Sequence, residues 1–155
     1  MIKLKRILAP TDFSEYSKSA LNYACEFAET FGAELHLLHV LQDIAVSIDE
    51  PGLAFASTGD FMAEYRAGAE RSLEKILDSE WEKGKQVVRE LVPGVPFLEI
   101  IRYAAANDID LIVIGTHGRT GLAHVLMGSA AEKVVRKASC PVLTVRHPEH
   151  EFIMP

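Results

Sequence analysis

Cysteine is scarce in this chain, and several other features that define protein classes are missing as well. The two cysteines, Cys25 and Cys140, stand far apart and in no metal or redox spacing, which excludes a disulfide framework. No apolar run reaches the roughly 20 residues that a membrane-spanning helix requires. The net charge of -6 provides no general attraction to nucleic acid or to anionic lipid. We therefore expect no nucleic acid and no membrane among the partners.

The 155 residues are enough for one ordinary domain with a sizeable core. The apolar share of 48% and the charged share of 25% are typical of a globular chain rather than a disordered one. The basic start, Met1 to Arg6, is followed by a short strand broken at Pro10 and lacks the apolar core and cleavage pattern of a signal peptide. We expect one domain over residues 1–147, a tail over residues 148–155, and a cytoplasmic location.

Short apolar runs and helical periodicities alternate along the chain, which is typical of an α/β domain with a parallel sheet. The third of the predicted strands is more polar than the others, so we expect it near an edge of the sheet. The strands are predicted at residues 7–9, 34–41, 86–92, 109–114 and 141–145. The helices are predicted from the turn at residues 12–14 to Phe31, from Phe61 to Gly84, from Pro96 to Asn107 and from Ala130 to Ala138.

Each predicted helix has an apolar side for the core. Asp12 or Ser14 is expected to cap the first helix, and Gly32 is expected to end it. The helix residues expected to face the core are Ala20, Leu21, Ala24, Phe27, Ala28, Phe31, Phe61, Met62, Tyr65, Ala69, Leu73, Ile76, Leu77, Ile100, Ile101, Ala104, Ala105, Ala130, Ala131, Val134, Val135 and Ala138.

Residues 42–59 show no clean period and contain recurring serine, proline and glycine. They predict a long loop with a short helical piece around residues 53–56. Long irregular loops in compact domains are often functional. This loop is either a flap over a neighbouring site or a tolerated surface insertion.

A strand, a glycine-spaced segment and a helix start follow one another between Ile109 and Ser129. Gly115 ends the predicted strand, and Gly128 with Ser129 leads into the fourth helix. Glycines let backbone amides approach an oxyanion, and the free amides of a helix N-terminus point toward it. Beyond the strand, the segment contains Arg119 and no acidic residue. It predicts a phosphate-binding loop; the alternative is a loop whose glycines serve only tight packing.

The glycine spacing is not that of the two common phosphate loops. A P-loop requires Lys-Ser or Lys-Thr after its last glycine, whereas Leu122 follows Gly121 here. A dinucleotide fingerprint requires Gly-x-Gly-x-x-Gly, of which only the second half is present. The stretch instead fits Gly-x2-Gly-x9-Gly-Ser, at Gly115, Gly118, Gly128 and Ser129. This spacing resembles the ATP-binding subgroup of the universal stress protein family.

The resemblance to this family covers nearly the whole chain. Residues 7–15 are similar to its first strand and turn, and residues 110–118 and 140–145 are similar to its fourth and fifth strands. The resemblance implies a five-stranded parallel sheet in the order 3-2-1-4-5 with helices on both faces, of the Rossmann-like or adenine nucleotide alpha hydrolase-like type. It also implies a bound adenine nucleotide where the strand order reverses, which is where open parallel sheets bind ligands.

The resemblance also assigns contacts to particular residues. Thr11 and Asp12 would contact the nucleoside, and Val40 would contact adenine through its backbone. The phosphates would lie among the loop amides, the Ser129 hydroxyl and Arg119. Asp12 has the alternative role of a helix cap, and Arg119 that of a solvated loop charge. The candidate nucleotide-binding residues are Pro10, Thr11, Asp12, Val40, Gly115, Thr116, His117, Gly118, Arg119, Gly128, Ser129 and Ala130.

The implied function is that of a nucleotide-binding stress-response or signalling module. The ligand would be ATP, or else ADP or AMP, with Mg²⁺ or Mn²⁺ on the phosphates where a cation is present. Phosphoryl transfer needs a metal carboxylate, a positioned base and a charge clamp, and the sequence offers only Asp12 and Arg119 toward these roles. We therefore assign no catalytic residue and expect a binding protein. The alternatives are a slow ATPase or phosphotransferase using the same pocket, and a nucleotide-free dimeric scaffold.

Two further expectations concern metals and self-association. His36 and His39 fall on opposite faces of their strand, and no zinc-type cluster occurs, so we expect no metal site in the protein itself. A last strand leaves a row of unpaired backbone groups that proteins normally cover. The resemblance implies a homodimer through this edge, to which the apolar residues Val142, Leu143 and Val145 are suited.

Overall fold

The computed structural model describes residues 1–42, 58–117 and 127–147. Some predictions lie outside the described residues. They concern the loop predicted at residues 42–59 with its helical piece, of which residues 43–57 are not described, Gly118, Arg119 and Gly121 of the glycine-rich loop, and the tail at residues 148–155. Within the described ranges, the chain forms one five-stranded sheet flanked by helices.

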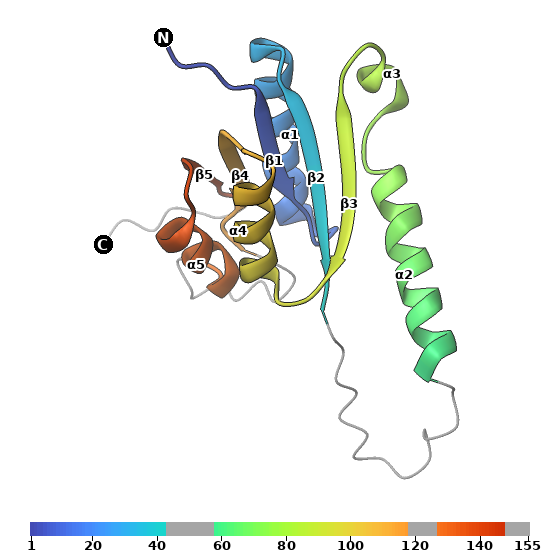
Figure 1. Ribbon diagram of the computed structural model, residues 1–155. Coiled ribbons are helices and arrows are strands. Elements are labelled where there is room, and N and C mark those ends of the chain that lie inside the picture. Colours follow the sequence, from blue (N-terminus) through green and yellow to red (C-terminus); the bar gives the residue numbers. More distant parts are fainter. Residues whose placement is uncertain (43–57, 118–126, 148–155) are drawn as a thin grey trace.

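All strands of the sheet are parallel. They are β1 (Arg6–Pro10), β2 (Glu34–Leu41), β3 (Val87–Pro93), β4 (Leu111–Gly115) and β5 (Val142–Val145). Their order is β3-β2-β1-β4-β5, which confirms the predicted α/β fold and places the polar third strand at an edge (Figure 1). The order reverses between β1 and β4, and there Ile7 is in register with Leu35 on one side and Leu111 on the other.

Helices cover both faces of the sheet. They are α1 (Glu15–Phe31), α2 (Thr58–Glu74), α3 (Ser79–Glu82), α4 (Pro96–Ala106) and α5 (Ser129–Lys137). One core cluster packs α1 and the end of α2 against the sheet, and a second packs α4 and α5 against the opposite face. Figure 1 shows α4 and α5 in front of the strands and α1 behind them. Three such layers form a doubly wound α/β domain.

The central strands are buried on both faces, as a parallel sheet between two helical layers requires. Along β2, Leu35 and Leu37 belong to the cluster beneath α1, while Leu38 and Val40 belong to the cluster beneath α4. This two-residue alternation is the geometry of a strand. Full burial of a leucine contributes about 1.5–3 kcal/mol relative to exposure. The core therefore holds the carboxyl ends of the central strands in a fixed relation to one another.

Helix α1 has a defined residue at each end. Ser14 rather than Asp12 is the N-cap, and its side chain accepts a hydrogen bond from the Ser17 amide. Asp12 instead accepts hydrogen bonds from the Ser14 amide and hydroxyl. Gly32 ends the helix as predicted, in the left-handed conformation at φ 63°.

The prediction of one helix over residues 61–84 is wrong in its length. The structure divides this stretch into α2 and α3. Asp78 begins the second piece, because its side chain accepts a hydrogen bond from the Glu80 amide at 2.7 Å and so caps a new helix. The chain turns at this cap, and Trp81 of α3 packs against the same core cluster as Leu73 of α2.

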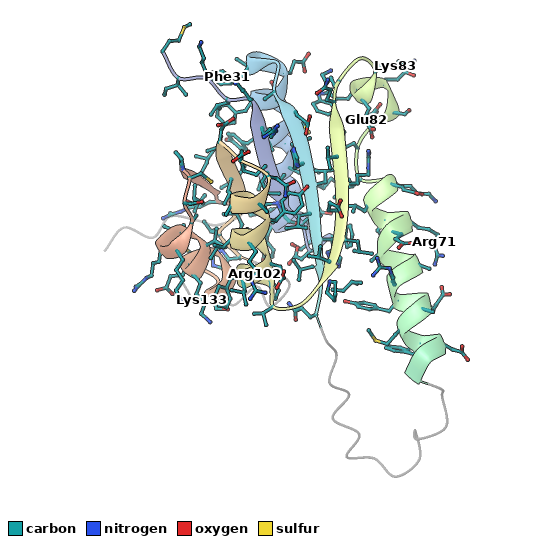
Figure 2. All side chains as sticks on the ribbon, viewed as in Figure 1. Phe31, Arg71, Glu82, Lys83, Arg102 and Lys133 are labelled. Carbon is teal, nitrogen blue, oxygen red and sulfur yellow. The ribbon has the colours of Figure 1, made fainter. Side chains whose placement is uncertain are left out.

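Several residues predicted to face the core are exposed instead. Each helix is covered only along the narrow side that meets the sheet, so residues at the margins of its apolar stripe remain in solvent. Phe31, at the end of α1, is one of them (Figure 2). The same figure shows charged residues such as Arg71 and Lys133 on the outer sides of other helices. The exposed fractions are 42% for Phe31, 49% for Phe61, 37% for Met62 and 44% for Val135, and Ala105 is also exposed.

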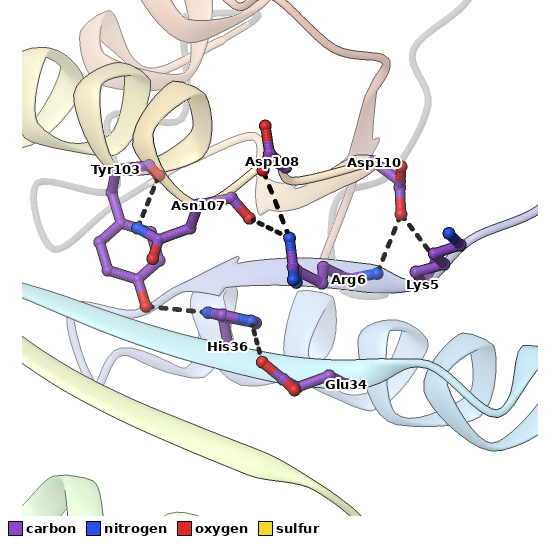
Figure 3. Close-up of polar contacts among 8 residues, drawn as sticks. All are labelled: Lys5, Arg6, Glu34, His36, Tyr103, Asn107, Asp108 and Asp110. Carbon is purple, nitrogen blue, oxygen red and sulfur yellow. Dashed lines mark hydrogen bonds and ion pairs between the residues drawn. The ribbon is translucent and has the colours of Figure 1, made fainter.

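A buried polar group joins β2 to α4 at the end of the sheet where β1 begins (Figure 3). The His36 side chain is buried, and its Nδ1 lies 2.8 Å from the Tyr103 hydroxyl. Its Nε2 lies 2.7 Å from Oε1 of Glu34, without the alignment of a hydrogen bond. Beside this group, the Asp110 carboxylate accepts a hydrogen bond from the Arg6 amide at 3.0 Å and ties the entry of β4 to β1.

We expect the stability of the protein to decrease as the pH falls through about 6.5. Burial lowers the pKa of His36 from 6.5, Arg6 lowers it further, and the carboxylates of Glu34 and Glu90 oppose the shift, while Tyr103 contacts the ring as a neutral hydroxyl. The unfolded chain therefore takes up this proton before the folded chain does, and the free energy of unfolding declines with acidification. Urea unfolding between about pH 7.5 and pH 5.5 measures the slope. His36→Gln should flatten it; an unchanged slope would assign the dependence to other groups.

Candidate functional site

A cavity of about 390 Å³ opens at the carboxyl ends of β1, β2 and β4. The strand order reverses at this edge, which is where doubly wound sheets bind ligands. Every predicted nucleotide-binding residue that the structure describes lines it: Pro10, Thr11, Asp12, Val40, Gly115, Thr116, His117, Gly128, Ser129 and Ala130. The structure thus brings the separate motifs of the sequence together, while their role in binding stays a prediction.

The turn after β1 forms one wall of the cavity. Pro10 is the last residue of β1, in register with Leu38, and the Thr11 amide donates to the Leu38 carbonyl at 2.9 Å. A proline at this position removes no hydrogen bond from the interior of the strand. The Thr11 hydroxyl is buried and lies 3.1 Å from the Ser17 hydroxyl of α1. Asp12 therefore lies between the end of β1 and the N-cap of α1, and hydrogen bonds hold both in place.

The end of β4 approaches α1 without a side chain between them. A Cβ atom added to Gly115 would lie 2.8 Å from the Tyr16 carbonyl oxygen, closer than real Cβ contacts allow. The next residue, Thr116, donates its amide to the Val145 carbonyl at 2.9 Å and accepts a hydrogen bond from the Gly128 amide at its own carbonyl. The two ends of the glycine-rich loop are thus joined directly to each other.

Helix α5 begins at the cavity with its first amides uncapped by a side chain. Its N-cap residue is Gly128, which has no side chain to offer, and Ser129 and Ala130 of the first turn line the cavity. The first amides of a helix have no partner within the helix and carry the positive end of its dipole. Together with the Ser129 hydroxyl, they form an arrangement suited to an oxyanion such as a phosphate.

An apolar surface lies on another side of the cavity. Leu38 and Val40 of β2, Ile114 of β4, and Pro96 and Ile100 of α4 contribute to it, and all of them except Pro96 are almost fully buried. Such a surface accepts the faces of a flat, weakly polar ring. The cavity therefore combines a place for a planar group with a place for an anion.

The sequence reasoning missed several residues that line the cavity. Tyr65, which the helical spacing predicts in the core, is only partly buried, and the sequence predicts for Pro96 only the start of a helix. Strand alternation could have identified two of the additional lining residues. Leu38 and Ile114 lie on the same face of the sheet as Val40, the face that α4 and α5 cover. Besides Tyr65 and Pro96, the additional lining residues are Ser17, Leu38, His39, Gln42, Ile100, Ile114 and Ala131.

Two buried histidines lie at the cavity. His117 has its Nδ1 3.1 Å from the Thr116 hydroxyl, and its ring centre lies 5.9 Å from that of Tyr16. His39 directs Nδ1 to the Thr11 carbonyl at 2.8 Å. Because His36 contacts α4 and His39 contacts the turn before α1, the prediction that they occupy opposite faces of β2 is confirmed.

Neither cysteine has the character of a nucleophile. Burial raises the pKa of the Cys25 thiol to about 11 and also raises the pKa of Cys140. Both stay protonated at neutral pH, and neither lines the cavity. Among residues 1–42, 58–117 and 127–147, no group of three or more His, Cys, Asp or Glu is placed to hold a metal ion. In the same ranges, no helix has the length and apolarity to span a membrane.

Fold and site together define a doubly wound α/β domain with a cavity at its switch point and a helix that starts at this cavity without a side-chain cap. The sequence profile of the Universal stress protein family matches residues 3–146. The chain belongs to this family.

Relatives of known sequence and structure support this assignment. Universal stress protein MJ0531 of Methanocaldococcus jannaschii is 36% identical over 95% of this chain and 85% of its own length. The structure of MJ0577 from the same organism is 31% identical, covers 96% of this chain and 99% of its own, and superposes with a TM-score of 0.82.

Two more distant structures share the fold and were solved with nucleotides. One is a universal stress protein in complex with cAMP, with 20% identity and a TM-score of 0.68 over 94% of this chain and 98% of its own. The other is a universal stress protein from Archaeoglobus fulgidus in complex with dAMP, with 24% identity and a TM-score of 0.60 over 93% of this chain and 98% of its own.

Proposed function

We propose that this protein binds an adenine nucleotide, foremost ATP, in the cavity at the carboxyl ends of β1, β2 and β4, and acts as a nucleotide-dependent stress-response or signalling module. The observation that carries the proposal is the pairing, within one cavity, of an apolar surface on β2, β4 and α4 with the uncapped start of α5. A nucleotide has the same two parts, a flat base and a polyanion.

The base would lie on the apolar surface, with Val40 contacting it through the backbone. The phosphates would lie against the amides at the start of α5 and the Ser129 hydroxyl. Asp12 and Thr11 would face the sugar, which would lie between the base and the phosphates. Gly118 and Arg119, predicted from the glycine motif, would complete the phosphate site.

The family relatives solved with cAMP and dAMP support an adenine nucleotide as the ligand class. ATP rather than AMP is favoured by the length of the glycine motif in the sequence, because a motif of this length would offer backbone amides to more than one phosphate. Mg²⁺ or Mn²⁺ would arrive with the triphosphate and keep its phosphates as principal ligands, since such ions commonly bind through substrate phosphates and water.

The proposal is tested by the nucleotide content of the purified protein and by titration. Protein is denatured, the supernatant is resolved by anion exchange, and stripped protein is then titrated with Mg-ATP by calorimetry, with Mg-GTP as the matched control. Near-stoichiometric adenine nucleotide, or saturable ATP binding that exceeds GTP binding, is expected. Absence of both nucleotide and binding heat would show that the glycines serve packing alone.

We further propose that the protein forms a homodimer through β5, a strand that pairs only with β4 in the described sheet. The carbonyls of Pro141 and Val145 accept hydrogen bonds from β4, so the alternate residues Val142 and Thr144 direct their backbone groups outward. Val142 and Leu143 are partly exposed, whereas Val145 is buried in the core and contributes no free surface.

Sedimentation is expected to give twice the chain mass of 17.1 kDa at micromolar concentration. Thr144→Pro removes one outward amide at an edge, where proline is tolerated, and should shift the protein to the monomer without unfolding it. A wild-type monomer, or a Thr144→Pro dimer of unchanged affinity, would contradict pairing through this edge.

A further inference from the structure

His39 of β2 is a buried polar residue whose place in the cavity the proposed ligand contacts do not explain. Its side chain lies in the wall between β2 and the turn that follows β1. Nδ1 lies 2.8 Å from the Thr11 carbonyl oxygen. A carbonyl only accepts, so Nδ1 carries the hydrogen, and the ring donates to the backbone of the residue before Asp12.

Phe13, on the other side of Asp12, has a backbone conformation that is unfavourable for its side chain. Its φ is 64°, in the left-handed region that bulky residues seldom occupy. Such conformations persist where surrounding contacts enforce them, and they gather at functional sites. The ring of Phe13 lies against that of His39, with 4.4 Å between the ring centres and 33° between the planes. His39 therefore contacts both neighbours of Asp12.

Hydrogen bonds within the turn also hold the residues on either side of Asp12 in place. The Phe13 amide donates to the Thr11 hydroxyl oxygen at 3.0 Å, and that oxygen lies 3.1 Å from the Ser17 hydroxyl on α1. The Ser14 amide donates to Oδ1 of Asp12 at 3.0 Å. The backbone on both sides of Asp12 is thus anchored to β2 and α1, and the orientation of its carboxylate follows from these anchors.

We infer that His39 and Phe13 are positioning residues for nucleotide binding, which hold the Thr11–Asp12–Phe13 turn so that the Asp12 carboxylate meets the sugar of the nucleotide without rearrangement. The inference rests on the proposed binding of an adenine nucleotide in this cavity. His39 has no assigned contact with the ligand and acts through the turn. Pre-organisation of this kind raises affinity by avoiding the cost of ordering the loop on binding.

The test is a double-mutant cycle on Mg-ATP affinity with His39→Leu, Asp12→Ala and the double variant. Asp12→Ala is expected to bind about tenfold more weakly, the effect of losing one good hydrogen bond to a charged group. His39→Leu is expected to lose up to the same factor, because the Asp12 carboxylate is then no longer held in place. If His39 acts through Asp12, the double variant should bind no more weakly than Asp12→Ala alone. Fully additive losses would overturn the inference, because His39 would then act independently of the carboxylate.

Two further variants separate positioning from general stability. His39→Asn keeps a side-chain amide donor near the position of Nδ1 and should recover most of the affinity that His39→Leu loses. Phe13→Gly relieves the strained φ, so it should fold well yet still weaken ATP binding, because the ring contact with His39 is gone. Tight binding by Phe13→Gly and by His39→Leu alike would overturn the inference.

A core variant serves as the control. Leu35→Val lies on the same face of β2 at the far end of the strand and should lower the urea midpoint without changing ATP affinity. Failure of the wild-type protein to bind ATP would refute the proposed function itself. Binding by the wild-type protein that His39→Leu leaves unchanged would refute only the positioning role.

Discussion

Ala130→Asp is expected to weaken ATP binding at least a hundredfold while leaving the fold intact. Ala130 lies in the first turn of α5 and lines the cavity beside Ser129. A carboxylate there would share the space proposed for the phosphates. Two unit charges about 5 Å apart repel by about 3 kcal/mol at an effective dielectric constant of about 20, which corresponds to at least a hundredfold loss of affinity.

The same substitution should not harm the helix. A negative side chain in the first turn interacts favourably with the helix dipole and stabilises it by about 0.3–1 kcal/mol. Unfolding by urea should therefore show an unchanged or slightly raised midpoint. This opposite behaviour of binding and stability separates an anion site from a packing site.

Ala130→Asn provides the matched control, because it has nearly the same shape as aspartate without the charge. It should reduce ATP affinity by no more than a small factor, and the difference between the two variants isolates electrostatic repulsion. Equal affinity of Ala130→Asp and Ala130→Asn would place the phosphates elsewhere. Higher salt should narrow the difference, since screening weakens charge repulsion.

Gly115→Ala is expected to destabilise the protein by about 2–3 kcal/mol, the upper range for overpacking of a well-packed interior. The added methyl carbon would lie 2.8 Å from the carbonyl oxygen and 3.1 Å from the carbonyl carbon of Tyr16. These are backbone atoms of α1, which has no rotamer to change, so the helix or the strand end must shift. For a domain of this size, the melting temperature should fall by roughly 2–4 °C per kcal/mol.

Gly68→Ala is the control for this prediction. Gly68 lies within α2, and an added Cβ would meet only the end of the Arg71 side chain at 3.9 Å. Alanine in a helix interior is more favourable than glycine by about 0.5–1 kcal/mol, so this variant should be stabilised. The melting temperatures of both variants and of the wild type, measured by thermal unfolding, test the two predictions together. A Gly115→Ala protein as stable as the wild type would mean that α1 and β4 are not held as closely as described.

The sequence predicted the layers of the fold well because strand and helix periodicities reflect which faces are buried. The apolar run predicted as a strand at residues 34–41 is β2, and its apolar positions alternate between the two core clusters. The strand order was not derivable from periodicity and came from the family resemblance. Phe61 and Val135 were placed in the core wrongly, since an apolar stripe marks one side of a helix without showing how wide a contact the sheet makes.

The candidate site was predictable where its residues belong to a local motif. The turn after β1 and the start of α5 carry their own signals, a cap and a glycine spacing. Tyr65 and Pro96 reach the cavity from α2 and α4, which approach it only through tertiary packing. His39 is a further case, because a histidine in a strand gives no indication that it donates to the Thr11 carbonyl of another strand end.

The two buried histidines of β2 lie in different environments, so one can serve as a reference for changes at the other. His36 is in contact with the Tyr103 hydroxyl, and His39, on the opposite face and one residue before Val40, lies at the cavity. In a nuclear magnetic resonance spectrum, their imidazole signals therefore report on two separate environments of one rigid element. We expect a ligand that enters the cavity to shift the His39 signal and to leave that of His36 in place, whereas a change in the whole sheet should shift both.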